Sequence, residues 1–170
     1  EDHVKNAMKG HDVVYHFAGL SDLDLGADQP LEAVRQNITG TVHLLNAALE
    51  VKVQRFILAS TIYVYSNLGG FYRCSKQAAE LFVEEFNGRY DLDFTVLRYG
   101  SLYGNRADES NSIKRFLLQG LREGKIVYPG TGDEMREYIH IKDAARLSVD
   151  IISPEYKNKH IVITGHHPMK

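Results

Sequence analysis

The sequence predicts an α/β fold built on a parallel sheet, and two observations lead to that prediction. Short apolar runs alternate along the chain with longer runs in which apolar residues recur every three or four positions. This alternation is typical of strand–helix–strand units, in which helices cover a parallel sheet. The chain has 170 residues, of which 44% are hydrophobic and 25% charged, so it is long and apolar enough for a sizeable buried core.

The predicted strands are short and rich in Val, Ile and Phe. The first follows an opening helix that ends near Lys9, and the others are spaced along the rest of the chain. Their ranges are 12–18, 55–59, 93–98, 126–128, 137–139 and 160–164. Because the first strand follows the chain start so closely and the chain stops just after the last one, we expect both ends to be cuts through a longer protein.

The predicted helices show a 3.6-residue period. Pro30 suits the first turn of a helix, and apolar residues follow it at spacings of three and four (Leu31, Val34, Ile38, Val42 and Leu45). Further helices are expected at 72–87, 113–121 and 141–152. A loop punctuated by glycines is expected at 99–106.

Composition excludes several classes of protein. Lys plus Arg number 20 and Asp plus Glu 22, so the formal charge of −2 gives no general reason to expect nucleic acid or an anionic membrane as a partner. A single cysteine excludes an internal disulfide and a multi-cysteine metal site, and the eight histidines lack metal-binding spacings, so no metal is expected. No apolar run approaches the roughly 18 residues of a membrane span. No signal peptide is recognisable either, so a cytoplasmic location is expected.

Tyr72 and Lys76 carry the most informative spacing in the chain. Residues four apart on a helix share a face, so both side chains can reach one point. A free phenol has a pKa of about 10, and work as a base near pH 7 requires the phenolate to be favoured by roughly 4 kcal/mol. A nearby ammonium acts in that direction. The spacing fits a pair that transfers a proton at a hydroxyl group. Taken alone, it fits equally an ordinary half-buried Tyr beside a solvated Lys.

Ser60 and Thr61 stand where the predicted strand 55–59 ends. Ligands of open parallel sheets bind at the carboxyl ends of the strands, so a hydroxyl there can hold a substrate oxygen. Taken alone, the two residues also fit an ordinary strand-ending turn. Together with Tyr72 and Lys76, they predict a catalytic site.

Six segments, in order from about Asp12 to Asp143, give the chain a resemblance to a known family. They are Asp12-Val13-Val14-Tyr15-His16-Phe17-Ala18-Gly19, Asn37-Ile38-Thr39-Gly40-Thr41, Ser60-Thr61 with Val64-Tyr65, Tyr72 with Lys76, Leu97-Arg98-Tyr99 through Tyr103-Gly104-Asn105-Arg106, and Arg136-Glu137-Tyr138-Ile139-His140 with Asp143. The chain resembles the extended short-chain dehydrogenase/reductases, and within them the NAD-dependent epimerases and dehydratases that act on sugar nucleotides.

The resemblance implies a fold and a division of the chain. It implies a three-layer Rossmann-like parallel sheet that lacks the first βα unit, with its Gly-rich turn, and the C-terminal part of the substrate lobe. Residues 1–104 are then the cofactor-binding portion, 105–135 part of the substrate lobe, and 136–170 a return to the Rossmann-like portion.

The resemblance also implies site residues. Thr61, Tyr72 and Lys76 are expected to be catalytic, with Tyr72 as general base. The expected NAD-binding residues are Phe17, Ala18, Gly19, Asn37, Ser60, Tyr72 and Lys76, and Ser101 and Arg136 are expected to bind a nucleotide-sugar substrate. Arg136 also fits a structural ion pair. A homodimer is implied through the helices at 31–50 and 72–87.

Departures from the family pattern reduce the number of candidate activities. Ile62 and Tyr63 stand where the 4,6-dehydratases of the family carry an Asp-Glu pair, so a UDP-hexose 4-epimerase is preferred to a dehydratase. Two alternatives stay open: a related dehydrogenase or ketoreductase, and a catalytically silent binding module. Glu80, Glu84 and Glu85 are interpreted as a solvated helix face.

Overall fold

The computed structural model describes residues 2–21, 28–128 and 130–169. The chain divides into two compact units. The first contains Glu1–Arg98 and Ile151–Val162, and the second contains Tyr99–Asp150 and Ile163–Lys170. The expected division at residues 104 and 135 stays a prediction.

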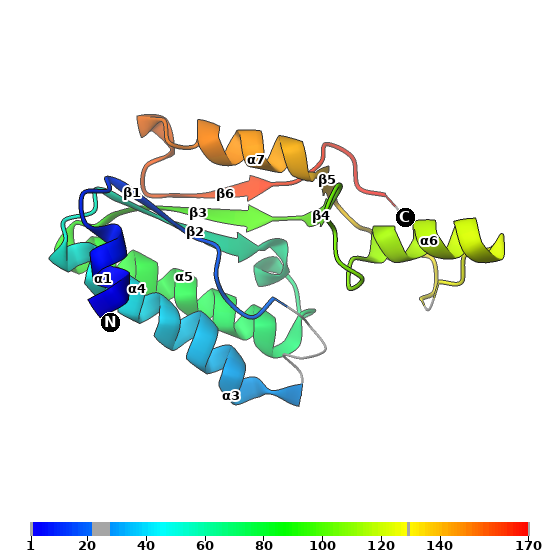
Figure 1. Ribbon diagram of the computed structural model, residues 1–170, viewed down its shortest axis with the longest axis horizontal. Coiled ribbons are helices and arrows are strands. Elements are labelled where there is room, and N and C mark those ends of the chain that lie inside the picture. Colours follow the sequence, from blue (N-terminus) through cyan, green and yellow to red (C-terminus); the bar gives the residue numbers. More distant parts are fainter. Residues whose placement is uncertain (1, 22–27, 129, 170) are drawn as a thin grey trace. The chain divides into compact units, whose positions relative to one another are not determined.

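The main sheet has four strands in the order β1-β2-β3-β6. These are β1 (Val13–His16), β2 (Arg55–Thr61), β3 (Asp93–Tyr99) and β6 (Lys159–Ile163). β1 and β2 are parallel, with Val13 opposite Arg55 and His16 opposite Leu58. In Figure 1 the arrows of β2, β3 and β6 point the same way. The predicted α/β class with a parallel sheet is confirmed.

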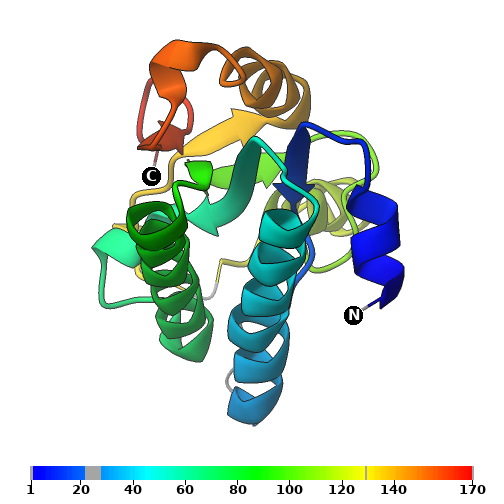
Figure 2. The same cartoon turned by 90° about the vertical axis from the view of Figure 1, so that its left-hand side faces the viewer.

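Helices of the first unit cover one face of this sheet. They are α1 (Asp2–Met8), α3 (Pro30–Ala33), the π-helix η1 (Val34–Thr39), α4 (Gly40–Glu50) and α5 (Gly70–Tyr90). Pro30 stands in the first turn of α3, as predicted, where its missing N–H costs nothing. Figure 2 shows α4 and α5 side by side below the strands. Short 3₁₀ turns lie at η2 (Ile62–Tyr65) and η3 (Pro154–Tyr156).

The core of the first unit lies between the strands and these two helices. Phe56 and Leu58 of β2 and Val96 of β3 are fully buried against Leu45 of α4 and Val83 of α5. Burial of each large apolar side chain contributes roughly 1.5–3 kcal/mol. This core holds the end of β2 and the first turns of α5 in fixed relation to each other.

The second unit holds a smaller parallel pair, β4 (Ser101–Tyr103) with β5 (Tyr138–His140), in which Ser101 lies opposite Tyr138. Its helices are α6 (Ser112–Glu123) and α7 (Ile141–Asp150). The Asn111 side chain caps α6 by accepting a hydrogen bond from Lys114 N, and Gly124 ends the helix with a positive φ of 68°.

Two sequence expectations are wrong in this unit. Residues 126–128 form no strand, because the Gln119 side chain takes the hydrogen bond from Val127 N that a strand partner would take. The segment 101–103 lies in the predicted loop but forms β4, because it pairs with a segment 37 residues further along the chain.

In the part of the chain that the structure describes, no helix is both long and apolar enough to cross a membrane.

Candidate active site

The end of β2 and the first turns of α5 bring the three predicted catalytic residues together. Thr61 is the last residue of β2, and Tyr72 and Lys76 lie on one side of α5. The side chains of Thr61 and Tyr72 share a hydrogen bond. The Lys76 ammonium lies 6.0 Å from the centre of the Tyr72 ring. The hydroxyl, the phenol and the ammonium that the sequence predicted therefore form one cluster.

Lys76 is buried, although it carries a charge. Its Nζ donates a hydrogen bond of 3.0 Å to the carbonyl oxygen of Ala59 on β2. Burial lowers the pKa of Lys76 to about 8, against an opposing effect of the Glu80 carboxylate. An ammonium has three N–H donors, so one that is held at a carbonyl can still offer donors to the hydroxyls of a ligand.

Tyr72 keeps its proton at neutral pH. Burial raises the pKa of the phenol, and its hydrogen bond with Thr61 offsets only part of that effect. Burial is therefore the largest effect on this phenol, and the expected lowering of the Tyr72 pKa by Lys76 stays a prediction. The protonated phenol can donate a hydrogen bond, and to act as a base Tyr72 needs a further positive charge nearby.

Asn37 joins the loop after β1 to α5. Its Oδ1 accepts from Leu20 N at 2.8 Å, and its Nδ2 donates to Leu20 O at 2.9 Å and to Ser75 Oγ at 2.8 Å. Ser75 Oγ in turn donates to Tyr72 O at 2.8 Å. The Asn37 amide therefore fixes the backbone on both sides of the site.

Gly19 brings the loop backbone next to Lys76. Its φ is +145°, and a side chain there would clash with Asn37 Oδ1, while its Cβ would lie 3.7 Å from Lys76 Nζ. Ala18 is exposed, and the exposed ring of Phe17 stacks on Tyr15 at 5.8 Å. Of the predicted cofactor-binding residues, Gly19, Asn37, Tyr72 and Lys76 thus lie in one neighbourhood.

Ser60 has a different partner. Its side chain is buried, and its Oγ donates to the carboxylate of Glu80 on α5. The interpretation of Glu80 as part of a solvated helix face is wrong. Because Glu80 follows Lys76 by four residues, it shares the inner face of α5 and is 4% exposed. Its cation partner is Arg98 of β3. The spacing from Lys76 was the signal in the sequence that could have identified Glu80.

Ser101 and Arg136 lie in the second unit. Ser101 begins β4, and its backbone N donates to Glu137 O at 2.8 Å. Arg136 and Met169 form an antiparallel bridge in which each backbone N donates to the other residue's O at 2.8 Å. Their roles in substrate binding stay predictions. Over the described ranges, no group of three or more His, Cys, Asp or Glu side chains could hold a metal ion.

Comparison with known proteins places this cluster in context. Residues 1–164 match the model of the NAD dependent epimerase/dehydratase family. A UDP-glucuronate 4-epimerase of Thermodesulfobacterium geofontis is 29% identical over 154 residues, which cover 83% of this chain and 48% of that protein. A dTDP-glucose 4,6-dehydratase of Streptomyces antibioticus is 31% identical over 165 residues, covering 88% of this chain and 48% of that protein. The chain spans about half the length of the curated relatives it matches.

Solved structures share the fold. A dTDP-glucose 4,6-dehydratase of Streptomyces venezuelae with NAD bound superposes with a TM-score of 0.90 and 23% identity, over 99% of this chain and 56% of that one. A UDP-glucose 4-epimerase of Thermotoga maritima with UDP-glucose superposes with a TM-score of 0.89 and 23% identity. The match covers 99% of this chain and 60% of that one. With a family model that matches nearly the whole chain, this protein belongs to the NAD dependent epimerase/dehydratase family.

Proposed function

We propose that this chain is the larger part of an NAD-dependent sugar-nucleotide 4-epimerase that acts on a UDP-hexose. The observation that supports the proposal is the convergence of Thr61, Tyr72 and Lys76 at the end of β2. A hydroxyl, a phenol and an ammonium in that arrangement can bind a sugar hydroxyl and move its proton.

The choice of an epimerase over a dehydratase rests on the residues after Thr61. Ile62 and Tyr63 begin the 3₁₀ turn η2 and bring no carboxylate to the position where the 4,6-dehydratases of the family carry two. Elimination of water from a sugar needs an acid and a base besides the Tyr–Lys pair. The relatives include both epimerases and dehydratases, so this local difference is the argument for the first.

The side chains present fit NAD. Lys76 offers hydrogen-bond donors next to the backbone of Gly19, and Tyr72 lies on the same side of α5 as Lys76. We expect Lys76 to hold the ribose hydroxyls and the backbone of residues 17–19 to line the site. NAD, when bound, supplies a hydride acceptor and a positive charge.

We propose the following roles for this chain's own residues. Thr61 orients the sugar hydroxyl by a hydrogen bond. Tyr72 takes the proton of that hydroxyl in one direction and returns it in the other, while Lys76 stabilises the phenolate. We also propose that Ser101 and Arg136 bind the nucleotide, with Arg136 as a bidentate partner of a phosphate.

The test uses the full-length protein, NAD and UDP-glucose. We expect NMR of the sugar to show UDP-galactose accumulating to equilibrium with no net NADH absorbance, because an epimerase returns the hydride that it removes. Sustained NADH release would instead identify a dehydrogenase. If UDP-glucose, UDP-glucuronate and UDP-N-acetylglucosamine all stay unchanged and no NAD is bound, the protein is a silent binding module.

The proposed homodimer uses exposed apolar residues of α3 and α5. Leu31 is 83% exposed and Leu81 64% exposed. A Leu81→Glu variant is expected to sediment as a monomer, whereas Leu121→Glu, which alters an exposed leucine of α6, is the control. If Leu81→Glu has the same mass as the wild type, this surface is not the interface. A cytoplasmic location stays a prediction from the sequence.

A further inference from the structure

Glu80 is a buried carboxylate one helical turn beyond Lys76. Tyr72, Lys76 and Glu80 follow one another at spacings of four on α5, so they lie in one row on the inner face of the helix. Glu80 is 4% exposed. A charge at such a site is tolerated only when other groups pair with it.

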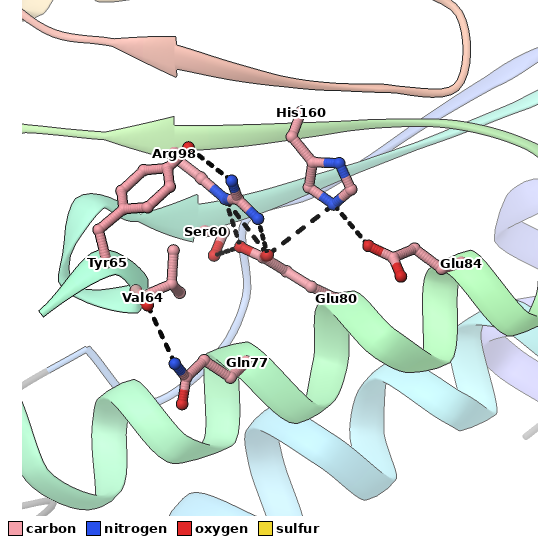
Figure 3. A network of polar contacts seen from close by, with 8 residues as sticks. All are labelled: Ser60, Val64, Tyr65, Gln77, Glu80, Glu84, Arg98 and His160. Carbon is pink, nitrogen blue, oxygen red and sulfur yellow. Dashed lines mark hydrogen bonds and ion pairs between the residues drawn. The ribbon is translucent and has the colours of Figure 1, made fainter.

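The partners of Glu80 come from three neighbouring strands, as Figure 3 shows. Ser60 of β2 donates to its Oε1. Arg98 of β3 brings Nη2 within 2.6 Å of Oε2 and Nε within 3.2 Å of Oε1, a two-pronged contact. His160 of β6 places Nε2 3.8 Å from Oε2. One carboxylate therefore ties α5 to β2, β3 and β6.

Consecutive residues of β2 hold Lys76 and Glu80. Ala59 accepts the hydrogen bond from Lys76 Nζ at 3.0 Å, and the next residue, Ser60, donates to Glu80. The position of the Lys76 ammonium relative to β2 thus depends on the anchoring of the same helix by Glu80. Arg98 also donates to Tyr65 Oη at 2.6 Å, which attaches the turn after Thr61 to the same network.

The charges around Lys76 point to a second effect of Glu80. Burial lowers the pKa of Lys76, and the negative charge of Glu80 opposes that shift. Arg98 and His160 face Glu80 from β3 and β6. The Glu84 carboxylate lies 3.0 Å from His160 Nε2. The charge of Lys76 also lowers the pKa of His16 on β1. Among these groups, Glu80 is the one whose negative charge favours the charged form of Lys76.

We propose that Glu80 is a positioning residue for the Tyr72–Lys76 pair: anchored by Ser60 and Arg98, it holds the Lys76 ammonium at Ala59 O and keeps it in its charged form. This inference deepens the proposed function, since it assumes that Tyr72 and Lys76 are the working pair. Glu80 itself would touch neither the substrate nor the cofactor, and would act through Lys76.

The test measures the titration of Lys76 directly. In Glu80→Gln, which keeps the shape of the side chain, we expect the titration midpoint of Lys76 Nζ to fall by about one pH unit, because one buried charge is lost. NMR of the protein with isotope-labelled lysines gives the midpoint, and Lys76→Arg identifies the signal. Glu84→Gln is the matched control: it removes a carboxylate one turn further along α5 and should leave the midpoint in place.

Glu80→Gln leaves Arg98 without its carboxylate, so a second variant protects the test against misfolding. Glu80→Gln with Arg98→Met replaces both charges by neutral side chains. The Lys76 midpoint is expected to fall in this double variant as well. A merely structural role would lower stability in these variants without moving the midpoint.

The alkaline limb of kcat/KM in the full-length enzyme is expected to move with the Lys76 midpoint. The titration needs no turnover, so failure of the epimerase assay leaves it readable. An unchanged Lys76 midpoint in folded Glu80→Gln, or in the double variant, overturns the inference even in an active enzyme.

Discussion

Asn37 Nδ2 donates a hydrogen bond of 2.8 Å to Ser75 Oγ, a side chain 38 residues further along the sequence. Ser75 passes the link to the backbone of Tyr72, and Asn37 also pairs with both backbone polar groups of Leu20. A single amide thus holds the loop after β1 and the first turns of α5 together. These contacts explain why the polar side chain of Asn37 is only 1% exposed.

Asn37→Ala is expected to lower the free energy of unfolding by about 2–4 kcal/mol, because it leaves buried backbone groups of Leu20 without partners. Urea denaturation measures the change. Asn46→Ala on the exposed side of α4 is the control and should stay within about 0.5 kcal/mol of the wild type. Equal stability of the two variants would mean that water replaces the amide at no cost.

Tyr72→Phe is expected to reduce kcat of the full-length enzyme by roughly 10² or more, because the variant keeps the ring and loses the group that transfers the proton. The control is Tyr90→Phe, which removes the same atom from an exposed tyrosine at the end of α5. Rates of sugar epimerisation followed by NMR give the comparison. Turnover of Tyr72→Phe at the wild-type rate would remove Tyr72 from the mechanism.

Sequence reasoning located Thr61, Tyr72 and Lys76 because the spacing of residues on one helix and the end of one strand are local properties. Glu80 was misassigned for the opposite reason. Whether a helical glutamate is solvated or buried depends on what faces it, and its partners lie 20 residues before it and 18 residues after it. The four-residue spacing from Lys76 is visible in the sequence, but the charge of Glu80 favoured the interpretation that its side chain is solvated.

The strand errors have the same cause. Residues 101–103 have glycines on both sides, which indicate a loop, but pairing with β5 makes them a strand. Residues 126–128 have the composition of a strand, but a Gln119 side chain satisfies Val127 N instead. In both segments, a contact with a distant residue outweighed local preference.

Lys76→Met is expected to stabilise the protein at pH 7 while it abolishes activity. Folding lowers the pKa of Lys76 from 10.5 to about 8, so the folded state binds this proton less tightly than the unfolded state. The free-energy cost of burying the Lys76 charge is complete below pH 8 and disappears as the pH rises to 10.5. After allowance for the lost hydrogen bond to Ala59, Lys76→Met is expected to raise the free energy of unfolding by roughly 2 kcal/mol at pH 7.

Thermal or urea unfolding at pH 7 and at pH 10.5 measures this difference, which should shrink at the higher pH. Lys125→Met, at an exposed lysine of the second unit, is the control and should show neither effect. A loss of stability in Lys76→Met at pH 7 would mean that the ammonium contributes more through its contacts than its burial costs.

His16 makes the first unit sensitive to acid. Its Nε2 lies 3.0 Å from Thr41 Oγ1, and that hydroxyl donates its own proton to Asn37 O at 2.6 Å, so the histidine must be the donor. Protonation of the other ring nitrogen would place a charge in a buried site near Lys76. Burial, together with the Lys76 charge, lowers the pKa of His16 from 6.5 to about 4.

Because the unfolded state takes up this proton first, the stability from neutral His16 is complete above pH 6.5 and declines as the pH falls towards 4. The total loss is roughly 3 kcal/mol. His16→Gln keeps an N–H donor for Thr41 but cannot be protonated, so its stability should fall less over this range. The free energy of unfolding at pH 7, 5.5 and 4 gives the slopes, and His11→Gln at an exposed position should keep the wild-type slope. If His16→Gln also keeps that slope, the acid sensitivity of the fold arises from its carboxylates instead.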